Sequence, residues 1–242
     1  MSGRKAVFNW SGGKDSAIAL HKIIAAGEPS ISCLLTTVNQ KFGRVSMHGV
    51  RTGLLERQAE LIGVPLVQVE LPEMPDMPTY EKLMMEQLLK LTEAGIKTAV
   101  FGDIFLDDLR KYREDTLSTI GINCVFPIWK IPTRSLIEEF VELGFKAITV
   151  CVDEKHLDKS FVGRVIDYSF IDDLPPNVDP CGENGEFHSF VYDGPIFSQP
   201  LHFRKGNIVY RRYNRSRPDS SEDRNPADPF DTGFWFCDLL PV

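Results

Sequence analysis

Residues 11–16 read Ser11-Gly12-Gly13-Lys14-Asp15-Ser16 and follow directly on an apolar run, Ala6 to Trp10. Apolar residues then recur at helical spacing from Ala17, so the six residues join a predicted strand to a predicted helix. Ligands of open α/β sheets bind where strands end and helices begin. Two adjacent glycines let backbone N–H groups approach an anion closely, and the helix start adds favourable partial charge. The stretch therefore predicts a phosphate-binding loop.

The side chains of this loop suit a nucleotide. Lys14 supplies a full positive charge, and the hydroxyls of Ser11 and Ser16 donate hydrogen bonds. Asp15 would repel a phosphate, so it indicates either a magnesium ion or a helix-capping role. The loop lacks the G-x-x-x-x-G-K spacing of a Walker A loop, which argues against a kinase-type or GTPase-type site. We therefore expect residues 11–16 to bind a nucleotide.

Strand-like runs alternate with helical stripes along the N-terminal part of the chain. Glycines close most of the stripes, as expected at the ends of helices. Regular alternation of this kind predicts an α/β fold, with a mostly parallel sheet and helices on both faces. We place this domain at residues 1–152. Its predicted strands are Ala6 to Trp10, Ile31 to Val38, Leu66 to Leu71, Thr98 to Phe101, Asn123 to Phe126 and Ala147 to Val152.

The rest of the chain predicts a smaller C-terminal α+β domain over residues 153–213, which we assign to substrate binding. A helix is expected over 161–174, and a strand pair over 196–203 and 207–213 that turns at Lys205-Gly206. Residues 214–229 are nearly devoid of apolar side chains and predict a flexible loop. The aromatic segment at 230–242 is expected to dock back on the body.

The overall composition narrows the classes of function. The 242 residues carry a net charge of −7, which argues against a nucleic-acid substrate because phosphate backbones are repelled. No apolar run is long enough for a membrane-spanning helix. The five cysteines are widely spaced and include no CxxC pair, so a disulfide framework or a zinc site is not predicted. A reducing cytoplasm fits this pattern best.

A second polar stretch covers residues 181–189 and reads Cys-Gly-Glu-Asn-Gly-Glu-Phe-His-Ser. Two carboxylates three residues apart, Glu183 and Glu186, suit magnesium binding or substrate orientation, although glycine, asparagine and glutamate are also common in plain surface turns. The loop at 11–16 resembles that of the N-type ATP pyrophosphatase (PP-loop) superfamily. The stretch at 181–189 resembles the Glu-Gly-Gly-Glu-Phe-Glu-Thr motif of the diphthine–ammonia ligase family within that superfamily. Smaller resemblances lie at 126–129, 144–146 and 157–164, and the likeness runs from about Val7 to about Phe197.

The resemblance implies a PP-loop, HUP-like fold and cleavage of ATP between its α and β phosphates, with magnesium as the second cofactor. It implies catalytic roles for Lys14, Asp15 and Glu186, with Asp15 as the magnesium ligand. ATP would lie on residues 11–16 and on Gly102, at the end of the fourth strand. The residues assigned to substrate binding are His48, Arg51, Asp103, Glu183, Asn184, Glu186 and His188.

Several of these residues also have plain structural explanations. Arg51 opens a helix at the ligand edge of the sheet and could clamp a carboxylate or phosphate, or pair with Glu56 or solvent. Asp103 could bind a hydroxyl, an ammonium group or magnesium, or simply start a helix. Gly102 would let a nucleotide approach closely.

The chain departs from the family motif at two positions. Asn184 stands where the motif has glycine, and His188 stands where it has an acid. Diphthine carries a quaternary ammonium group, so loss of an acid weakens the attraction for it, while His48 and Arg51 favour an anion. We therefore expect an acceptor other than diphthine, a small-molecule or modified-residue carboxylate.

The leading interpretation is an ATP-dependent C–N ligase that adenylates a carboxylate and transfers ammonia or an amine. One alternative is a tRNA thiolation enzyme on the same loop, and another is a non-catalytic nucleotide sensor. Unpaired cysteines and acidic charge weigh against thiolation, and retention of Lys14 and Asp15 weighs against a sensor. The sequence also allows a homo-oligomer.

Overall fold

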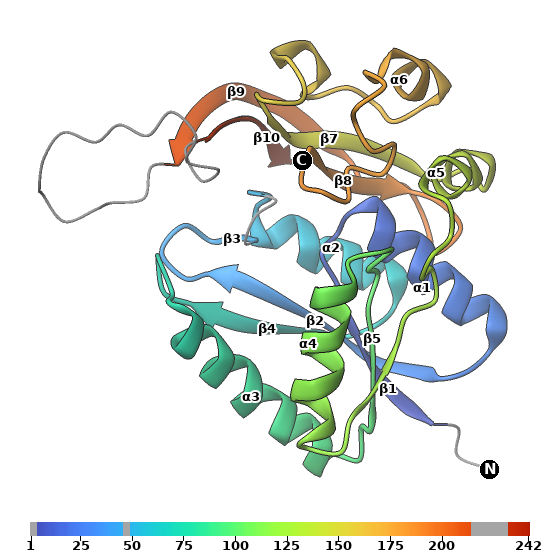
Figure 1. The fold of residues 1–242 in the computed structure, drawn as a ribbon, viewed down its shortest axis with the longest axis vertical. Helices are drawn as coiled ribbons and strands as arrows, with labels where there is room; N and C mark the ends of the chain where they lie inside the picture. Colours follow the sequence, from blue (N-terminus) through green and yellow to red (C-terminus); the bar gives the residue numbers. More distant parts are fainter. Residues whose placement is uncertain (1–3, 46–48, 214–231) are drawn as a thin grey trace, which may run out of the picture.

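The computed structural model describes residues 4–45, 49–213 and 232–242. A mostly parallel sheet forms its lower layer (Figure 1). The strand order is β3-β2-β1-β5-β6, and β4 pairs with the other side of β2. β3 is antiparallel to β2, and all other pairings in this sheet are parallel. The strands are β1 (Lys5–Asn9), β2 (Ser30–Asn39), β3 (Arg44–Val45), β4 (Leu66–Leu71), β5 (Thr98–Val100) and β6 (Asn123–Val125).

Helices cover both faces of this sheet, as the alternating sequence predicts. Side chains alternate along β1, so Phe8 packs with α1, α2 and α5, whereas Val7 packs on the other face with α3 and α4. Residues in the left-handed region, such as Gly27 and Gly63, end α1 and α2. The helices are α1 (Lys14–Ala26), α2 (Thr52–Ile62), α3 (Met77–Glu93), α4 (Asp107–Ser118) and α5 (Thr133–Glu142).

A second, antiparallel sheet forms the upper layer, with strand order β8-β7-β10-β9. Figure 1 places it over the starts of α1 and α2, which is the ligand edge of the first sheet. The 3-10 helix η1 and the short helix α6 belong to the same part of the chain. The bounds are β7 (Lys146–Asp153), η1 (Lys159–Phe161), α6 (Tyr168–Asp173), β8 (Phe187–Asp193), β9 (Phe203–Tyr213) and β10 (Thr232–Pro241).

Three expectations for this region need correction. The strand expected at 147–152 exists as β7, but it lies inside the second sheet and not at the end of the first. The strand pair expected over 196–203 and 207–213 does not form, because residues 196–202 are not in a strand and Phe203–Tyr213 is one continuous strand, β9, whose partner is β10. The helix expected over 161–174 is reduced to α6, because Gly163 is in the left-handed region and residues 163–166 hydrogen-bond to β7.

One apolar core runs through both layers. Phe8 and Leu55 of the lower layer belong to the same buried cluster as Ile148 and Phe190 of the upper layer. The loop expected at 214–229 lies outside the described residues. Across the part of the chain that the structure describes, no helix has both the length and the apolar character needed to cross a membrane. The division at residue 152 into two domains stays a proposal, since the layers share this core.

Candidate functional site

The glycine-rich loop sits between β1 and α1, with a backbone that only glycine adopts easily. Gly12 has φ of +80°, and a Cβ there would lie 2.8 Å from Gln58 Oε1. The Ser11 hydroxyl accepts a hydrogen bond from the Gly13 N–H at 3.2 Å and lies 3.1 Å from the Ser16 hydroxyl. Ser16 Oγ donates to the Gly13 carbonyl at 2.9 Å. The predicted loop residues are therefore brought together at the start of α1.

The loop is fastened to β8 of the upper layer. The Val191 N–H donates to the Gly12 carbonyl at 2.9 Å, and the Gln58 amide donates to Gly12 O at 3.1 Å and to Val191 O at 2.6 Å. The Ser189 hydroxyl accepts the Lys14 N–H at 3.1 Å, which satisfies one of the free N–H groups at the helix start. The two layers therefore share the phosphate-binding loop.

Lys14 and Asp15 form a buried ion pair at the centre of the site. Lys14 Nζ lies 2.8 Å from Asp15 Oδ2, and the Lys14 side chain is 4% exposed, against 27% for Asp15. Burial opposes the charge on Lys14, yet Asp15, with Cys181 and Glu183, raises the pKa of this lysine above its ordinary value. Burial raises the pKa of Asp15, and Lys14 works against that rise. A positive charge in low dielectric beside a helix N-terminus is well suited to a phosphate.

Asp15 is the one predicted magnesium ligand. Among the described residues, no group of three or more histidine, cysteine or acidic side chains could hold a metal ion by itself. Magnesium bound with a nucleotide usually needs only one or two carboxylates beside the phosphates. The second oxygen of the partly exposed Asp15 carboxylate fits that requirement.

The 181–189 stretch is held together by Glu186. This residue is 1% exposed, and its carboxylate accepts hydrogen bonds from the Asp179 N–H and from the backbone and side chain of Asn184, at 3.0–3.1 Å. Burial opposes ionisation, but these hydrogen bonds keep the pKa of Glu186 below its ordinary value. These contacts give Glu186 and Asn184 a structural role within the loop. A catalytic role for Glu186 stays a prediction.

Glu183 connects the same stretch to the lower layer. Its Oε1 accepts the N–H groups of Ile104 at 2.8 Å and Phe105 at 3.4 Å, just beyond the end of β5. Burial raises the pKa of Glu183 to about 7, with Asp15 adding to the rise. This carboxyl therefore faces the Lys14–Asp15 pair and changes its charge near neutral pH.

We expect the stability of the protein to depend on the charge of Glu183. Between 4.5, its ordinary value, and about 7, the folded protein holds a proton that the unfolded chain releases. The free energy of unfolding should therefore fall as the pH rises through this window, by on the order of 1–3 kcal/mol relative to Glu183→Gln. Urea unfolding at several pH values measures it. Glu70→Gln, on the exposed side of β4, is the control, and parallel pH curves for wild type and Glu183→Gln would contradict the prediction.

Gly102 and Asp103 have partners inside the protein. A Cβ on Gly102 would lie 3.1 Å from the backbone of Asp15 and Ser16, so the glycine permits the close approach of β5 to the start of α1. The Asp103 carboxylate forms two hydrogen bonds with Arg113, at 2.7 and 3.2 Å. The nucleotide and substrate roles predicted for these two residues stay predictions.

Arg51 lies across the gap between the layers, where it pairs with Asp238 of β10 through two hydrogen bonds at 3.2 and 2.6 Å. Neither Glu56 nor solvent alone is its partner. His188 lies on β8, opposite Cys151 of β7, and is half-buried. His48 lies outside the described residues.

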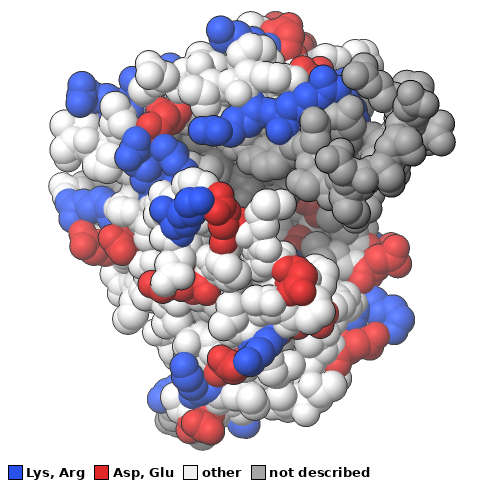
Figure 2. Space-filling view, turned by 90° about the vertical axis from the view of Figure 1, so that its left-hand side faces the viewer, with Lys and Arg blue, Asp and Glu red and all other residues white. Residues whose placement is uncertain are grey.

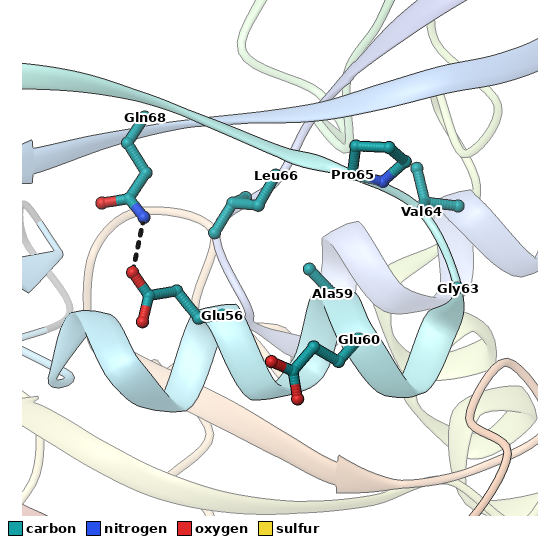
Figure 3. Close-up of a pocket in the computed structure, with 8 residues that line it drawn as sticks. All are labelled: Glu56, Ala59, Glu60, Gly63, Val64, Pro65, Leu66 and Gln68. Carbon is teal, nitrogen blue, oxygen red and sulfur yellow. Dashed lines mark hydrogen bonds between the residues drawn. The ribbon is translucent and has the colours of Figure 1, made fainter.

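Sequence reasoning missed Gln58 and Ser189 as parts of the site. Gln58 is fully buried on an otherwise apolar face of α2, and this polar residue in an apolar stripe is the signal that could have found it. A hollow of about 540 Å³ between α2 and β4 is lined by Glu56, Glu60 and Gln68 among others (Figure 3). It holds none of the predicted site residues, so we place the site at the phosphate-binding loop instead.

Comparison with known proteins identifies relatives. The family description "Diphthamide synthase N-terminal domain" matches residues 4–124, and "Diphthamide synthase C-terminal domain" matches residues 132–215. The chain is 23% identical over 221 residues to a diphthine–ammonia ligase of Bos taurus, covering 82% of each chain. It is 25% identical over 217 residues to that of Danio rerio, covering 79% of this chain and 83% of the other.

Among solved structures, the chain is similar to the U34-tRNA thiolase NcsA from Methanococcus maripaludis with its [4Fe-4S] cluster. The identity is 19% and the TM-score 0.36, over 58% of this chain and 57% of the other. At that TM-score the likeness carries no argument.

Proposed function

The chain belongs to the diphthamide synthase family, and from this premise we propose that it is an ATP-dependent, AMP-forming C–N ligase. In the first step an acceptor carboxylate oxygen attacks the α-phosphorus of ATP, and pyrophosphate leaves. In the second step ammonia or an amine attacks the acyl carbon, AMP leaves, and the nitrogen loses a proton. The buried Lys14–Asp15 pair at the start of α1 is the observation that carries this proposal.

The chain would act mainly by positioning and by electrostatics. Lys14 offers a fixed positive charge in a site nearly closed to water, and the Ser189 hydroxyl orients the backbone around it. Asp15 is the residue that would hold magnesium, which when bound neutralises phosphate charge. Water exclusion by the upper layer protects an acyl-adenylate from hydrolysis.

The cysteines favour this proposal over tRNA thiolation. Cys33, Cys151, Cys181 and Cys237 are buried, and Cys124 is half-buried. Burial raises the pKa of the Cys124 thiol to about 11 and that of the other four above the ordinary value. Sulfur transfer needs a reactive thiolate, and these thiols stay protonated near neutral pH.

The products of ATP test the reaction type. With an accepted acid and ammonium present, we expect AMP and pyrophosphate in equal amounts, because the loop at 11–16 lacks Walker A spacing. Chromatography of the nucleotides and a pyrophosphate assay measure this. Stoichiometric ADP and orthophosphate would refute the proposal, and ATP binding without any turnover would favour the nucleotide sensor.

We propose further that the acceptor is not diphthine, the substrate named for the relatives. His188 shares a face of the upper sheet with Phe236, whose ring lies against Gly49 of the lower layer, so the histidine faces the gap between the layers. A neutral or positive group there does not attract a quaternary ammonium. We expect at most slow amidation of a diphthine-bearing protein, and a gain of that activity in His188→Glu. Mass spectrometry of the protein substrate measures the conversion. Efficient conversion by the wild type would contradict this prediction.

A further inference from the structure

Two arginines of the lower layer meet one carboxylate of the upper layer at the start of α2. Asp238 accepts hydrogen bonds from Arg51 at 3.2 and 2.6 Å and from Arg44 at 2.9 Å. Burial opposes ionisation, but Arg51 and Arg44 keep the pKa of Asp238 below its ordinary value, so the carboxylate is charged. Two guanidinium groups and one carboxylate leave one positive charge in excess within this Arg44–Asp238–Arg51 cluster.

The cluster retains donors that Asp238 does not use. A guanidinium has five N–H groups. Arg51 uses two of them, both on Asp238. Arg44 uses one on Asp238 and one on the Gly49 carbonyl, at 2.6 Å, among the described residues. Both arginines are reachable, with side chains 33% and 41% exposed. The Thr52 hydroxyl, next to Arg51, is buried without a hydrogen-bond partner among the described residues.

The start of α2 adds to the positive potential at this cluster. Arg51 is the N-cap of the helix and makes no side-chain cap hydrogen bond. The Thr52 N–H donates to the Gly43 carbonyl and the Leu54 N–H to the Arg51 carbonyl, so the helix dipole is what adds positive potential there. Excess positive charge, unused N–H donors, an unpartnered hydroxyl and a helix N-terminus all favour an anion.

The cluster is separate from the phosphate-binding loop, and both lie where the two layers meet. Gln58, which holds Gly12, lies seven residues beyond Arg51 on α2, or about 10 Å at the rise of an α-helix. Across the upper sheet, β8 with Ser189 and β10 with Asp238 are two strand spacings apart, again about 10 Å. Figure 2 shows a row of lysine and arginine side chains across the upper part of this face, and their positive charge draws anions to this side.

We propose that the Arg44–Asp238–Arg51 cluster binds a second anionic group of the acceptor, about 10 Å from the carboxyl that is adenylated. The acceptor is then a dianion, with one end at the phosphate-binding loop and the other at the start of α2. This inference rests on the proposed function for the activated end, whereas the anion site itself does not require turnover.

Three acids test the spacing. Suberate spans about this distance when extended, succinate is too short, and octanoate has a carboxyl at one end only. Calorimetry in the presence of α,β-methylene-ATP should show suberate binding at least about tenfold more tightly than the other two. Equal binding of suberate and octanoate would overturn the proposal, as would tighter binding of succinate.

Variants assign the binding to the cluster. Arg51→Gln and Arg44→Gln should each weaken suberate binding by about 10–100-fold, and Asp238→Asn should strengthen it, because a competing carboxylate is removed. Arg57→Gln is the matched control, since Arg57 lies on the same helix and pairs with exposed Glu60. If Arg51→Gln unfolds, Arg51→Lys takes its place. Lysine keeps the charge but lacks the two-pronged guanidinium, so the loss of suberate affinity should be intermediate. Unchanged suberate binding in a folded Arg51 variant would overturn the proposal.

Pyrophosphate exchange separates the two proposals. Exchange that is equal with suberate and octanoate, and insensitive to Arg51→Gln, would overturn the second anion site and leave the ligase proposal standing. Absence of exchange with every acid, with suberate binding and its loss in Arg51→Gln intact, would count against the ligase and support the anion site.

Discussion

Lys14→Met should lower ATP-dependent turnover by ~10²-fold or more, the usual scale for loss of one preorganised charged group. Lys14 is 3% exposed, so its charge acts with little screening by water. Methionine keeps most of the side-chain volume and removes only the ammonium group. Pyrophosphate exchange and steady-state AMP release measure the effect.

The burial of Lys14 also affects how the variant must be judged. Removal of the ammonium group leaves the Asp15 carboxylate without its partner, so the substitution can also lower the stability of the fold. A thermal unfolding midpoint is therefore needed beside the rates. Lys22→Met is the matched control, because Lys22 lies on the same helix and pairs with Glu139 away from the loop. Near wild-type turnover of a folded Lys14→Met protein would rule out the role.

Gln58→Leu should destabilise the protein by about 3 kcal/mol, because the buried Trp10 N–H and Val191 carbonyl lose the partner that Gln58 provides, and the Gly12 carbonyl keeps only the Val191 N–H. Gln58 is fully buried, accepts the Trp10 indole N–H at 2.9 Å, and donates to the carbonyls of Gly12 and Val191. Leucine has a similar size, so the loss comes from unsatisfied groups and not from a cavity. Urea unfolding gives the free energy, and the affinity for ATP should fall as the loop loosens.

The control for this variant is Gln68, a half-buried glutamine whose hydrogen bond is open to solvent. Gln68 donates to Glu56 at 2.8 Å on the surface of the α2–β4 hollow, as Figure 3 shows, and Gln68→Leu should change stability by less than about 0.5 kcal/mol. Equal effects of the two substitutions would mean that Gln58 is not the link between the layers.

Local signals in the sequence predicted the lower layer well. The place of the 11–16 loop between a strand and a helix, and the alternation of strands with glycine-ended helices, depend on neighbouring residues, and both were confirmed. Phosphate binding by this loop stays a prediction. Local signals do not predict which residues pair when they are far apart in the sequence. Nothing near Arg51 points to Asp238, which lies 187 residues away, and nothing near Gly12 points to Val191.

The errors in the upper layer have the same origin. The pattern over 147–152 identified a buried strand, but its sheet is decided by β10, at the far end of the chain. Gly206 was interpreted as a turn residue, whereas a Cβ there would lie 3.2 Å from the Asp238 carbonyl, where the register of β9 against β10 shifts. The glycine relieves crowding inside a strand and does not reverse the chain.

The position of β10 also sets an order of events during synthesis. β10 lies between β7 and β9 but follows both in the chain, so both strands present an open edge until Thr232–Pro241 has been made. The same late segment carries Asp238, which joins the two layers. A nascent chain therefore joins its two layers only once β10 has been made, and a premature stop codon just before residue 232 should yield an aggregation-prone product and not a shortened folded protein.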